Sequence, residues 1–150
     1  MAENNTVSFD TYTPSNNSEL NKDDVLDFLF KHLDEYGDER KDIAACMEYA
    51  LSTAEGKGGA VHVAREDGKV VGALIMNNTG MGGYIPENIL VYVAVHNSQR
   101  GKGVGKKLVQ LAVDNSKGSI ALHVEPQNPA RHLYEKLGFT NKYLEYRLHR

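Results

Sequence analysis

The chain has 150 residues and a formal net charge of −3, and 41% of its residues are hydrophobic, a composition that indicates one folded domain and excludes whole-chain disorder. The small negative charge gives no general attraction to nucleic acid, and no apolar run approaches the ~20 residues of a membrane span. The single cysteine, Cys46, excludes a disulfide framework and a multi-cysteine zinc site. Because the N-terminus also lacks a basic segment followed by an apolar core, we expect one cytoplasmic domain over residues 1–150, with no metal site, no nucleic-acid partner and no membrane partner.

The first half of the chain predicts a strand, two helices and a strand pair. Alternation indicates a strand at residues 7–13. Apolar residues then recur at helical spacing in two segments that Gly37 divides, with Asp38 as the expected cap of the second helix. Strands at 60–65 and 69–77 flank a tight hairpin turn. The two apolar helix faces consist of Val25, Leu26, Leu29, Phe30 and Leu33, and of Ile43, Ala44, Met47, Ala50 and Leu51.

The second half predicts a central strand followed by alternating helices and strands. Residues 89–95 are almost all apolar, which is typical of a strand covered on both faces. We expect a helix within 102–117, a strand at 119–125, a helix at 129–137 and extended structure at 139–149. The order is β-α-α-β-β-β-α-β-α-β. It predicts an α/β (α+β) fold whose sheet is mixed, mainly antiparallel and flanked by helices.

A glycine-rich turn after the central strand is the strongest chemical feature of the sequence. The turn comprises Arg100, Gly101, Lys102, Gly103, Val104 and Gly105. Glycine lets a backbone turn its N–H groups outward, and the following helix adds unpaired first-turn N–H groups and its positive dipole end. We interpret the turn as a phosphate or diphosphate site, with Arg100, Lys102 and Lys106 as flanking cations. The G-x-G-x-G spacing fits neither the dinucleotide fingerprint nor the nucleotide-binding P-loop; a plain flexible turn is the alternative.

Two motifs together resemble the GNAT superfamily of acyl-CoA-dependent N-acyltransferases. The family signature Q/R-x-x-G-x-G/A is matched by Arg100, Gly103 and Gly105 after an apolar strand. The family segment A-x-x-L-Y-E-K-x-G-F is matched by residues 130–139, with a predicted strand between the two motifs. The resemblance covers residues 60–139. Residues 1–59 agree with the family only in the order of a strand and two helices.

The resemblance implies an N-acetyltransferase with acetyl-CoA as co-substrate and direct attack by a primary amine in a ternary complex. The diphosphate would lie on the amides of residues 100–105, and the pantetheine arm would lie along the fourth strand near Val93 and Val95, where the fourth and fifth strands splay apart. An amide near Val93 would stabilise the oxyanion. Tyr134 would protonate the leaving thiolate; its alternative role is that of an ordinary core aromatic. The amide contact to the CoA arm falls on Asn128 or on Gln127, because the helix start is one residue shorter than is usual in the family.

The sequence offers several candidates for the general base. His123 stands where several family members carry a glutamate, and Glu125 projects to the same strand face. His96 and Glu87 are further candidates, and His123 without any proton role is the alternative.

The acceptor is expected to be a small-molecule or peptide amine. The acidic residues Asp34, Glu35, Asp38 and Glu39 would attract a cation or simply form a solvated helix end. Met81 and Tyr84 would line the acceptor pocket or simply belong to a mobile glycine-rich loop. A CoA-binding module without turnover is the alternative function, and a nucleotide- or nucleic-acid-binding domain is a third reading that the acidic balance disfavours. A homodimer is compatible with an exposed closing strand.

Overall fold

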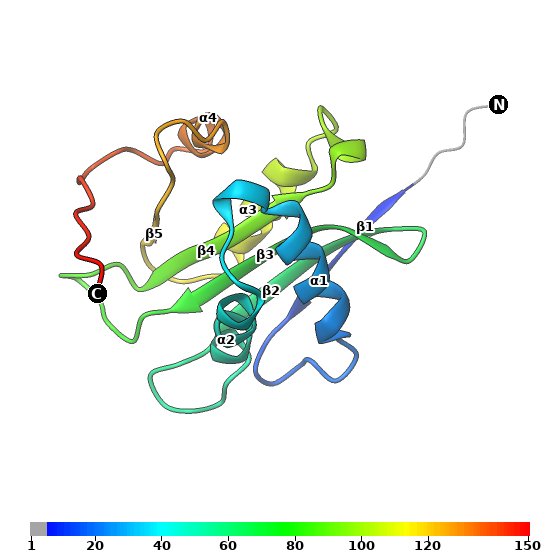
Figure 1. The fold of residues 1–150 in the computed structure, drawn as a ribbon. Coiled ribbons are helices and arrows are strands. Elements are labelled where there is room, and N and C mark those ends of the chain that lie inside the picture. The colour runs from blue at the N-terminus through cyan, green and yellow to red at the C-terminus, as the bar shows by residue number, and fades with distance from the viewer. Residues whose placement is uncertain (1–5) are drawn as a thin grey trace.

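The computed structural model describes residues 6–150 and contains one five-stranded sheet flanked by helices (Figure 1). The prediction that the N-terminus lacks the pattern of a secretory signal concerns residues 1–5 in part, and these lie outside the described residues. The strands are β1 (Val7–Tyr12), β2 (Gly59–Glu66), β3 (Lys69–Asn78), β4 (Asn88–Val95) and β5 (Ile120–Leu122). The helices are α1 (Lys22–His32), α2 (Arg40–Ala50), α3 (Val104–Asp114) and α4 (Ala130–Lys136), and short 3-10 helices are η1 (Asp34–Tyr36) and η2 (Asn97–Gln99).

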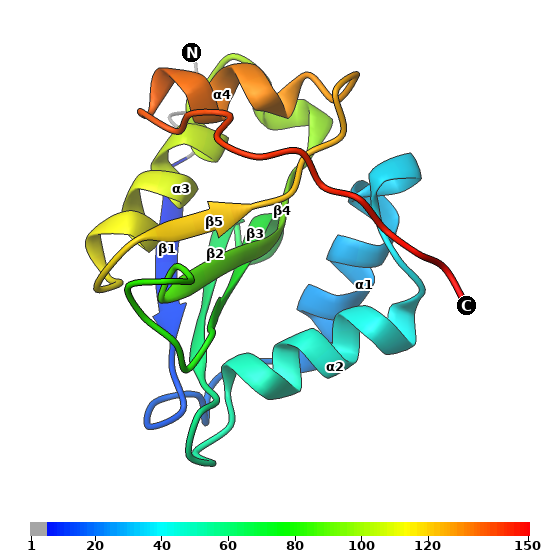
Figure 2. The same cartoon turned by 90° about the vertical axis from the view of Figure 1, so that its left-hand side faces the viewer.

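The strands lie in sequence order, β1-β2-β3-β4-β5. The first four pair antiparallel, and β5 joins β4 in parallel after the crossover through α3. α1 and α2 cover one face of the sheet, whereas α3 and α4 lie on the other (Figure 2). The predicted fold class is therefore confirmed.

Each face of the sheet has its own apolar core. On the α1 and α2 face, Leu29, Ile43 and Met47 are fully buried against the sheet. On the other face, α3 packs closely on β3, because a Cβ at Gly72 would lie 2.9 Å from Leu108 Cδ1. These cores fix both helix layers relative to β4, the strand that carries the candidate site.

A β-bulge interrupts the pairing of β4 with β3. Met76 pairs with Leu90 but Ile75 pairs with Tyr92, so Val91 is the extra residue. Beyond it the side-chain alternation is reversed: Leu90 belongs to the core under α3, and Tyr92 belongs to the core under α1 and α2. The bulge thus sets which face of the sheet each side chain in the second half of β4 points to.

The C-terminal part of the chain differs most from prediction. β5 ends at Leu122 instead of residue 125, and within the described residues the segment 139–149 forms no strand. A strand needs a neighbour to pair its backbone groups, and residues 123–125 have diverged from β4.

The α1–α2 region also differs in two details. The backbone places Glu39, not Asp38, at the N-cap of α2; the Asp38 carboxylate instead accepts a hydrogen bond from Tyr92. Phe30 is 53% exposed and does not belong to the buried face of α1. None of the helices described between residues 6 and 150 has the length and apolar character needed to cross a bilayer.

Candidate functional site

β4 and β5 diverge partway along β4. Their pairing is limited to Asn88 with Ile120, Ile89 with Ala121 and Leu90 with Leu122. β4 then continues to Val95 on the β3 side, while the chain after Leu122 leaves the sheet (Figure 2). The second half of β4 therefore has an edge that is not paired with β5, as the resemblance implies.

The bulge decides which backbone groups face that edge. The Asn88 N–H donates toward β5, to the Ser119 carbonyl at 3.1 Å, whereas the His96 N–H donates toward β3 at 2.8 Å. The backbone N–H groups of even-numbered residues therefore point toward β5 before the bulge and toward β3 after it, as one inserted residue requires. Val93 and Val95 consequently direct their N–H and C=O groups toward the free edge, where an extended ligand can pair with them as an added strand.

The glycine-rich turn lies at the end of this edge. Gly101 (φ 75°) and Gly103 (φ 77°) adopt left-handed backbone conformations, which favour glycine. The amides of Arg100 and Lys102 donate to the carbonyls of Asn97 and Gln99 in the preceding η2, at 3.1 Å each. These two amides stabilise the turn itself, so not all amides of residues 100–105 are available to a ligand.

The first turn of α3 supplies the remaining donors. Lys107 N–H makes the first helical bond, to Gly103 O at 3.0 Å, and Gly103 has no side chain to cap the helix. By helix geometry the amides of Val104, Gly105 and Lys106 point out of the N-terminus without an intrahelical acceptor. The side chains of Arg100, Lys102 and Lys106 are exposed around them, while Val104 buries its side chain in the core. Free amides and exposed cations at a helix N-terminus have the geometry of sites that phosphates occupy, and we refer to this candidate as the anion site.

Three elements meet beside the anion site. A Cβ at Gly105 would lie 3.5 Å from Val95 Cγ2 and 3.5 Å from Leu133 Cδ2. The end of β4, the start of α3 and the middle of α4 therefore converge at one glycine. Leu133 precedes Tyr134, so this contact also brings the tyrosine helix to the free edge of β4.

Tyr134 lies in the core between α3, α4 and β4. Its side chain is 7% exposed, shares a core cluster with Val93 and Val95, and contacts the Phe139 ring at 5.9 Å between centroids. Among residues 6–150 its hydroxyl has no hydrogen-bond partner. Burial raises the pKa of Tyr134 to about 12, so the hydroxyl is neutral at pH 7 and able to donate a proton.

The amide candidates before α4 have different surroundings. Asn128 Oδ1 accepts the Ala130 N–H at 2.9 Å, which satisfies one of the free donors at the start of α4. Gln127 is exposed. Asn128 thus has a local structural role that leaves its Nδ2 group for a ligand.

The first two base candidates lie just beyond the end of β5. His123 and Glu125 are exposed and outside the strand, so their predicted position on one strand face is wrong. Partial burial and the charges of Glu35 and Glu125 raise the pKa of Tyr36. The charge of Glu125 therefore acts on Tyr36 of η1, which lies in the α1–α2 connection.

The other two base candidates have local partners. His96 Nδ1 accepts the Ser98 N–H at 3.0 Å, and its ring lies 4.8 Å from the His32 ring on the α1 side. Glu87 Oε1 accepts the Ser119 N–H at 3.2 Å, where β4 and β5 are still paired. Glu87 is therefore at the opposite end of β4 from the glycine-rich turn.

Tyr92 is a candidate site residue that the sequence analysis missed. Its side chain is 7% exposed, and its hydroxyl donates to Asp38 Oδ2 at 2.5 Å, which joins β4 to the α1–α2 connection. Burial and the hydrogen bond to Asp38 raise the pKa of Tyr92. The sequence feature that could have identified Tyr92 is its hydroxyl, the one polar side-chain group within the apolar stretch 89–95.

The remaining acceptor candidates are at the surface. Asp34, Glu35, Asp38 and Glu39 are exposed, and among them Asp38 is the one tied to β4. Met81 is 43% exposed and Tyr84 is 80% exposed in the β3–β4 loop. The structure thus joins one member of the acidic run, Asp38, to the free-edge half of β4.

Comparisons with known proteins agree with this geometry. A family model described as an acetyltransferase (GNAT) domain matches residues 57–141. The 5-NmdU N-acetyltransferase of Pseudomonas phage PaMx11 is 30% identical over 102 residues, which cover 67% of this chain and 70% of the relative.

Solved structures share the fold along nearly the whole chain. The ribosomal-protein-alanine N-acetyltransferase of Brucella melitensis biovar Abortus 2308 superposes with a TM-score of 0.67 at 20% identity, covering 97% of this chain and 99% of that one. The aminoglycoside N-acetyltransferase AAC(6')-Iy, solved in complex with CoA, superposes with a TM-score of 0.66 at 21% identity, covering 98% and 99%.

Proposed function

Because the chain belongs to the GNAT acetyltransferase family, we propose that it transfers the acetyl group of acetyl-CoA to a primary amine by direct attack. That the chain is an acyltransferase follows from the family. The observation that carries the proposal is the free edge of β4, with the backbone of Val93 and Val95 facing it, the anion site at one end and Tyr134 beside it.

The residues fit acetyl-CoA as an extended, anionic substrate. The α3 amides and the exposed cations of the turn bind the diphosphate. The pantetheine arm pairs with Val93 and Val95, and the Val93 N–H is the donor available to the thioester carbonyl oxygen. The room left by Gly105 between Val95 and Leu133 lets the arm pass from the turn to the strand edge.

The reaction requires the amine as a neutral nucleophile. Its lone pair attacks the thioester carbonyl carbon, and the oxyanion that forms is stabilised by the strand amide. The C–S bond then breaks, the thiolate takes the proton of the Tyr134 hydroxyl, and the surplus proton on nitrogen is released toward solvent. The products are the N-acetyl amine and CoA, and one proton returns to Tyr134.

We propose that the acceptor is a small cationic amine that approaches from the α1 and α2 face. Asp38, held by Tyr92 at 2.5 Å, places a negative charge on that face beside the second half of β4. Glu125 adds a second charge, which acts on Tyr36 of η1. The exposed positions of His123 and Glu125 suit proton transfer through water. We also propose that residues 1–150 form one such domain and that it acts in the cytoplasm, on the evidence of a single cysteine.

The direct test is turnover with a defined amine panel. Purified protein is incubated with acetyl-CoA and 5-NmdU, an aminoglycoside, a polyamine or an N-terminal peptide, and free thiol is recorded. We expect thiol release with at least one cationic small molecule and a calorimetric signal for CoA. CoA binding without turnover across the panel would support the CoA-binding module instead. Failure to bind CoA would refute the proposed site.

A further inference from the structure

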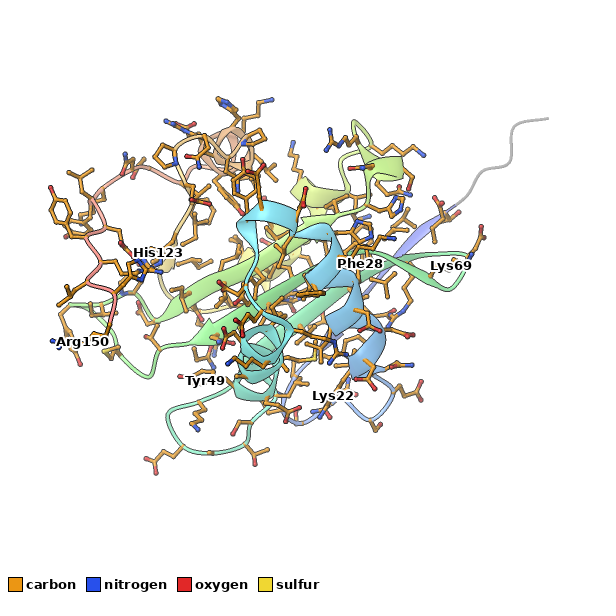
Figure 3. All side chains as sticks on the ribbon, in the orientation of Figure 1. Lys22, Phe28, Tyr49, Lys69, His123 and Arg150 are labelled. Carbon is orange, nitrogen blue, oxygen red and sulfur yellow. The ribbon has the colours of Figure 1, made fainter. Side chains whose placement is uncertain are left out.

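A cavity of about 260 Å³ lies on the β1 side of the glycine-rich turn. Its lining comes from β1, from Glu66 at the end of β2, from η2, and from the turn and the first residues of α3. Figure 3 shows Lys69, which pairs with Glu66 at the β2–β3 hairpin, on the opposite side of the molecule from His123. The volume suits a small metabolite, since pockets for drug-sized ligands begin at roughly 300 Å³.

The cavity and the proposed path of CoA lie on opposite flanks of α3. Lys107 lines the cavity, and its ammonium group lies 4.7 Å from the centre of the Phe9 ring on β1. Gly105 faces Val95 and Leu133 on the other flank. Two positions along an α-helix correspond to a rotation of about 200°. The cavity is therefore separate from the free edge of β4.

Gln99 carries the strongest indication that the cavity holds a ligand. Its side chain is 1% exposed and lines the cavity, and among residues 6–150 its Oε1 atom has no hydrogen-bond partner. Its Nε2 group donates to Glu66 Oε2 at 3.3 Å and to Ser98 Oγ at 3.2 Å. This contact fixes the orientation of the amide, because a flipped amide would set its oxygen against the Glu66 carboxylate.

An unpartnered acceptor of this kind has a defined requirement. Buried side-chain oxygens in folded proteins are almost always hydrogen-bonded, and one that is not is costly. The occupant of the cavity must therefore present an N–H or O–H donor to Gln99 Oε1.

The cavity also presents charges of both signs. Glu66 contributes a half-buried carboxylate, and Lys102 and Lys107 contribute exposed ammonium groups. Within the described part of the chain, none of these three side chains forms an ion pair. A ligand thus finds a negative partner beside Gln99 and positive partners along α3, and hydrogen bonds to such charged groups are the strong ones.

We propose that this cavity binds a free α-amino acid with an apolar side chain. The ammonium group donates to Gln99 Oε1 and to the Glu66 carboxylate. The carboxylate group accepts hydrogen bonds from Lys102 and from Lys107, whose ammonium lies over the Phe9 ring. The apolar side chain packs on the half-buried β1 wall of the cavity, which removes it from water.

An amino acid satisfies these groups better than other small ligands do. A nucleotide brings N–H donors and negative charge, but no cation to place beside Glu66. A simple amine leaves the two lysines without a partner, and a water molecule satisfies Gln99 but neither set of charges. A zwitterion is the chemistry that matches the acceptor, the carboxylate and the ammonium groups at once.

Calorimetry on the full chain without CoA tests the site. L-leucine, L-methionine and L-phenylalanine are titrated separately, and we expect at least one to bind one site per chain with a Kd below about 1 mM. The analogues of that amino acid without the ammonium or without the carboxylate, which for L-leucine are isocaproate and isoamylamine, should each bind at least about tenfold more weakly, because each loses a charged contact. Binding of none of the three amino acids, or an analogue that binds as tightly as its parent, would overturn the proposal.

Neighbouring lysines on α3 provide a matched pair of variants. Lys107→Gln removes a charge from the cavity and should weaken amino-acid binding at least about tenfold. Lys106→Gln removes the same charge one position away, from a side chain outside the cavity lining, and should leave the Kd within about twofold. Gln99→Met keeps the size of the buried side chain but removes the acceptor; it should also lose at least about tenfold in affinity, and urea denaturation reports that it folds. Wild-type affinity in Lys107→Gln would contradict the proposal whatever Gln99→Met does.

Binding in the presence of CoA separates this site from the proposed acetyltransferase site. Saturating CoA, or AMP as a nucleotide probe, should leave the Kd of the amino acid within about twofold. Full displacement of the amino acid by either compound would show that the cavity belongs to a nucleotide site, and would overturn the proposal. Amino-acid binding needs neither CoA nor turnover, so it can fail or succeed independently of the proposed function.

Discussion

Replacement of Tyr134 by phenylalanine separates the proton-donor role of this residue from its packing role. The hydroxyl has no hydrogen-bond partner among residues 6–150, and the ring is buried against Phe139. The Tyr134→Phe variant therefore keeps the packing and loses no internal hydrogen bond. We expect its free energy of unfolding at pH 7 to stay within about 0.5 kcal/mol of wild type.

The effect on catalysis should be much larger. Loss of a general acid lowers kcat by roughly 10- to 1,000-fold, equivalent to about 1.4–4 kcal/mol of activation free energy. CoA affinity should not change. The matched control Tyr12→Phe, in the β1 strand at the opposite edge of the sheet, should leave kcat unaltered.

The pH dependence provides an independent readout. With its pKa raised to about 12, Tyr134 is ionised to about 1% at pH 10, whereas a solvent-exposed tyrosine is about half ionised. Wild-type kcat should therefore show no alkaline decrease due to Tyr134 up to pH 10. Equal kcat for Tyr134→Phe and wild type under saturating substrates would refute the proton-donor role.

The same pKa predicts a stability effect of defined sign. The unfolded tyrosine ionises near pH 10 and the folded one near 12, so its contribution is fully present below pH 10 and is lost as the pH rises toward 12, by about 3 kcal/mol. Urea denaturation at pH 8 and pH 11 should show about half of this loss in wild type, about 1.4 kcal/mol, because pH 11 lies one unit above the unfolded pKa, and a smaller loss in Tyr134→Phe.

Three further predictions concern other parts of the molecule. Burial lowers the pKa of His62 to about 4, so wild type should lose about 3 kcal/mol of stability as the pH falls from 6.5 to 4, and His62→Gln should show a flatter urea-denaturation profile. In Gly105→Val the new side chain fills the space 3.5 Å from Val95. Calorimetry should show CoA binding weakened more than about tenfold, because a clash of about 1.4 kcal/mol already has that effect. The control Gly82→Val, in the β3–β4 loop, should leave CoA binding unchanged. Asp38→Asn keeps a hydrogen-bond acceptor for the Tyr92 hydroxyl but removes the negative charge. KM for a cationic amine should rise about fivefold, equivalent to about 1 kcal/mol, whereas KM for acetyl-CoA should not change. An unchanged KM for the amine would show that Asp38 does not contact the amine substrate.

The sequence predicted the elements whose signals are local. Residues 89–95 gave an unbroken apolar pattern, and the glycines at 101, 103 and 105 marked the strand-to-helix turn, because periodicity and left-handed backbone positions leave direct traces in sequence. Residues 139–149 also alternate in a way that favours a strand, but strand formation depends on a neighbour that the described chain does not provide.

Site residues that depend on tertiary contacts were harder to predict. The Tyr92–Asp38 hydrogen bond joins residues from β4 and the α1–α2 connection, and no short-range pattern encodes it. The predicted shared face of His123 and Glu125 assumed that β5 continues to residue 125, whereas the strand ends at Leu122. The free-edge amides of Val93 and Val95 came from the resemblance, and their physical basis, the bulge at Val91, is visible only in the register.

Under the proposed function, the inserted residue at Val91 makes recognition of the two substrates interdependent. One backbone irregularity both turns the Val93 amide toward the free edge, where we propose that the acyl donor binds, and places the Tyr92 ring on the α1 and α2 face, from which we propose that the amine approaches. If Val91 were instead part of a regular, unbulged strand, both orientations would be reversed together, because successive residues of a strand point to opposite faces. If the proposal holds, evolution or engineering of a new amine preference would have to leave this strand untouched and change the α1–α2 connection instead.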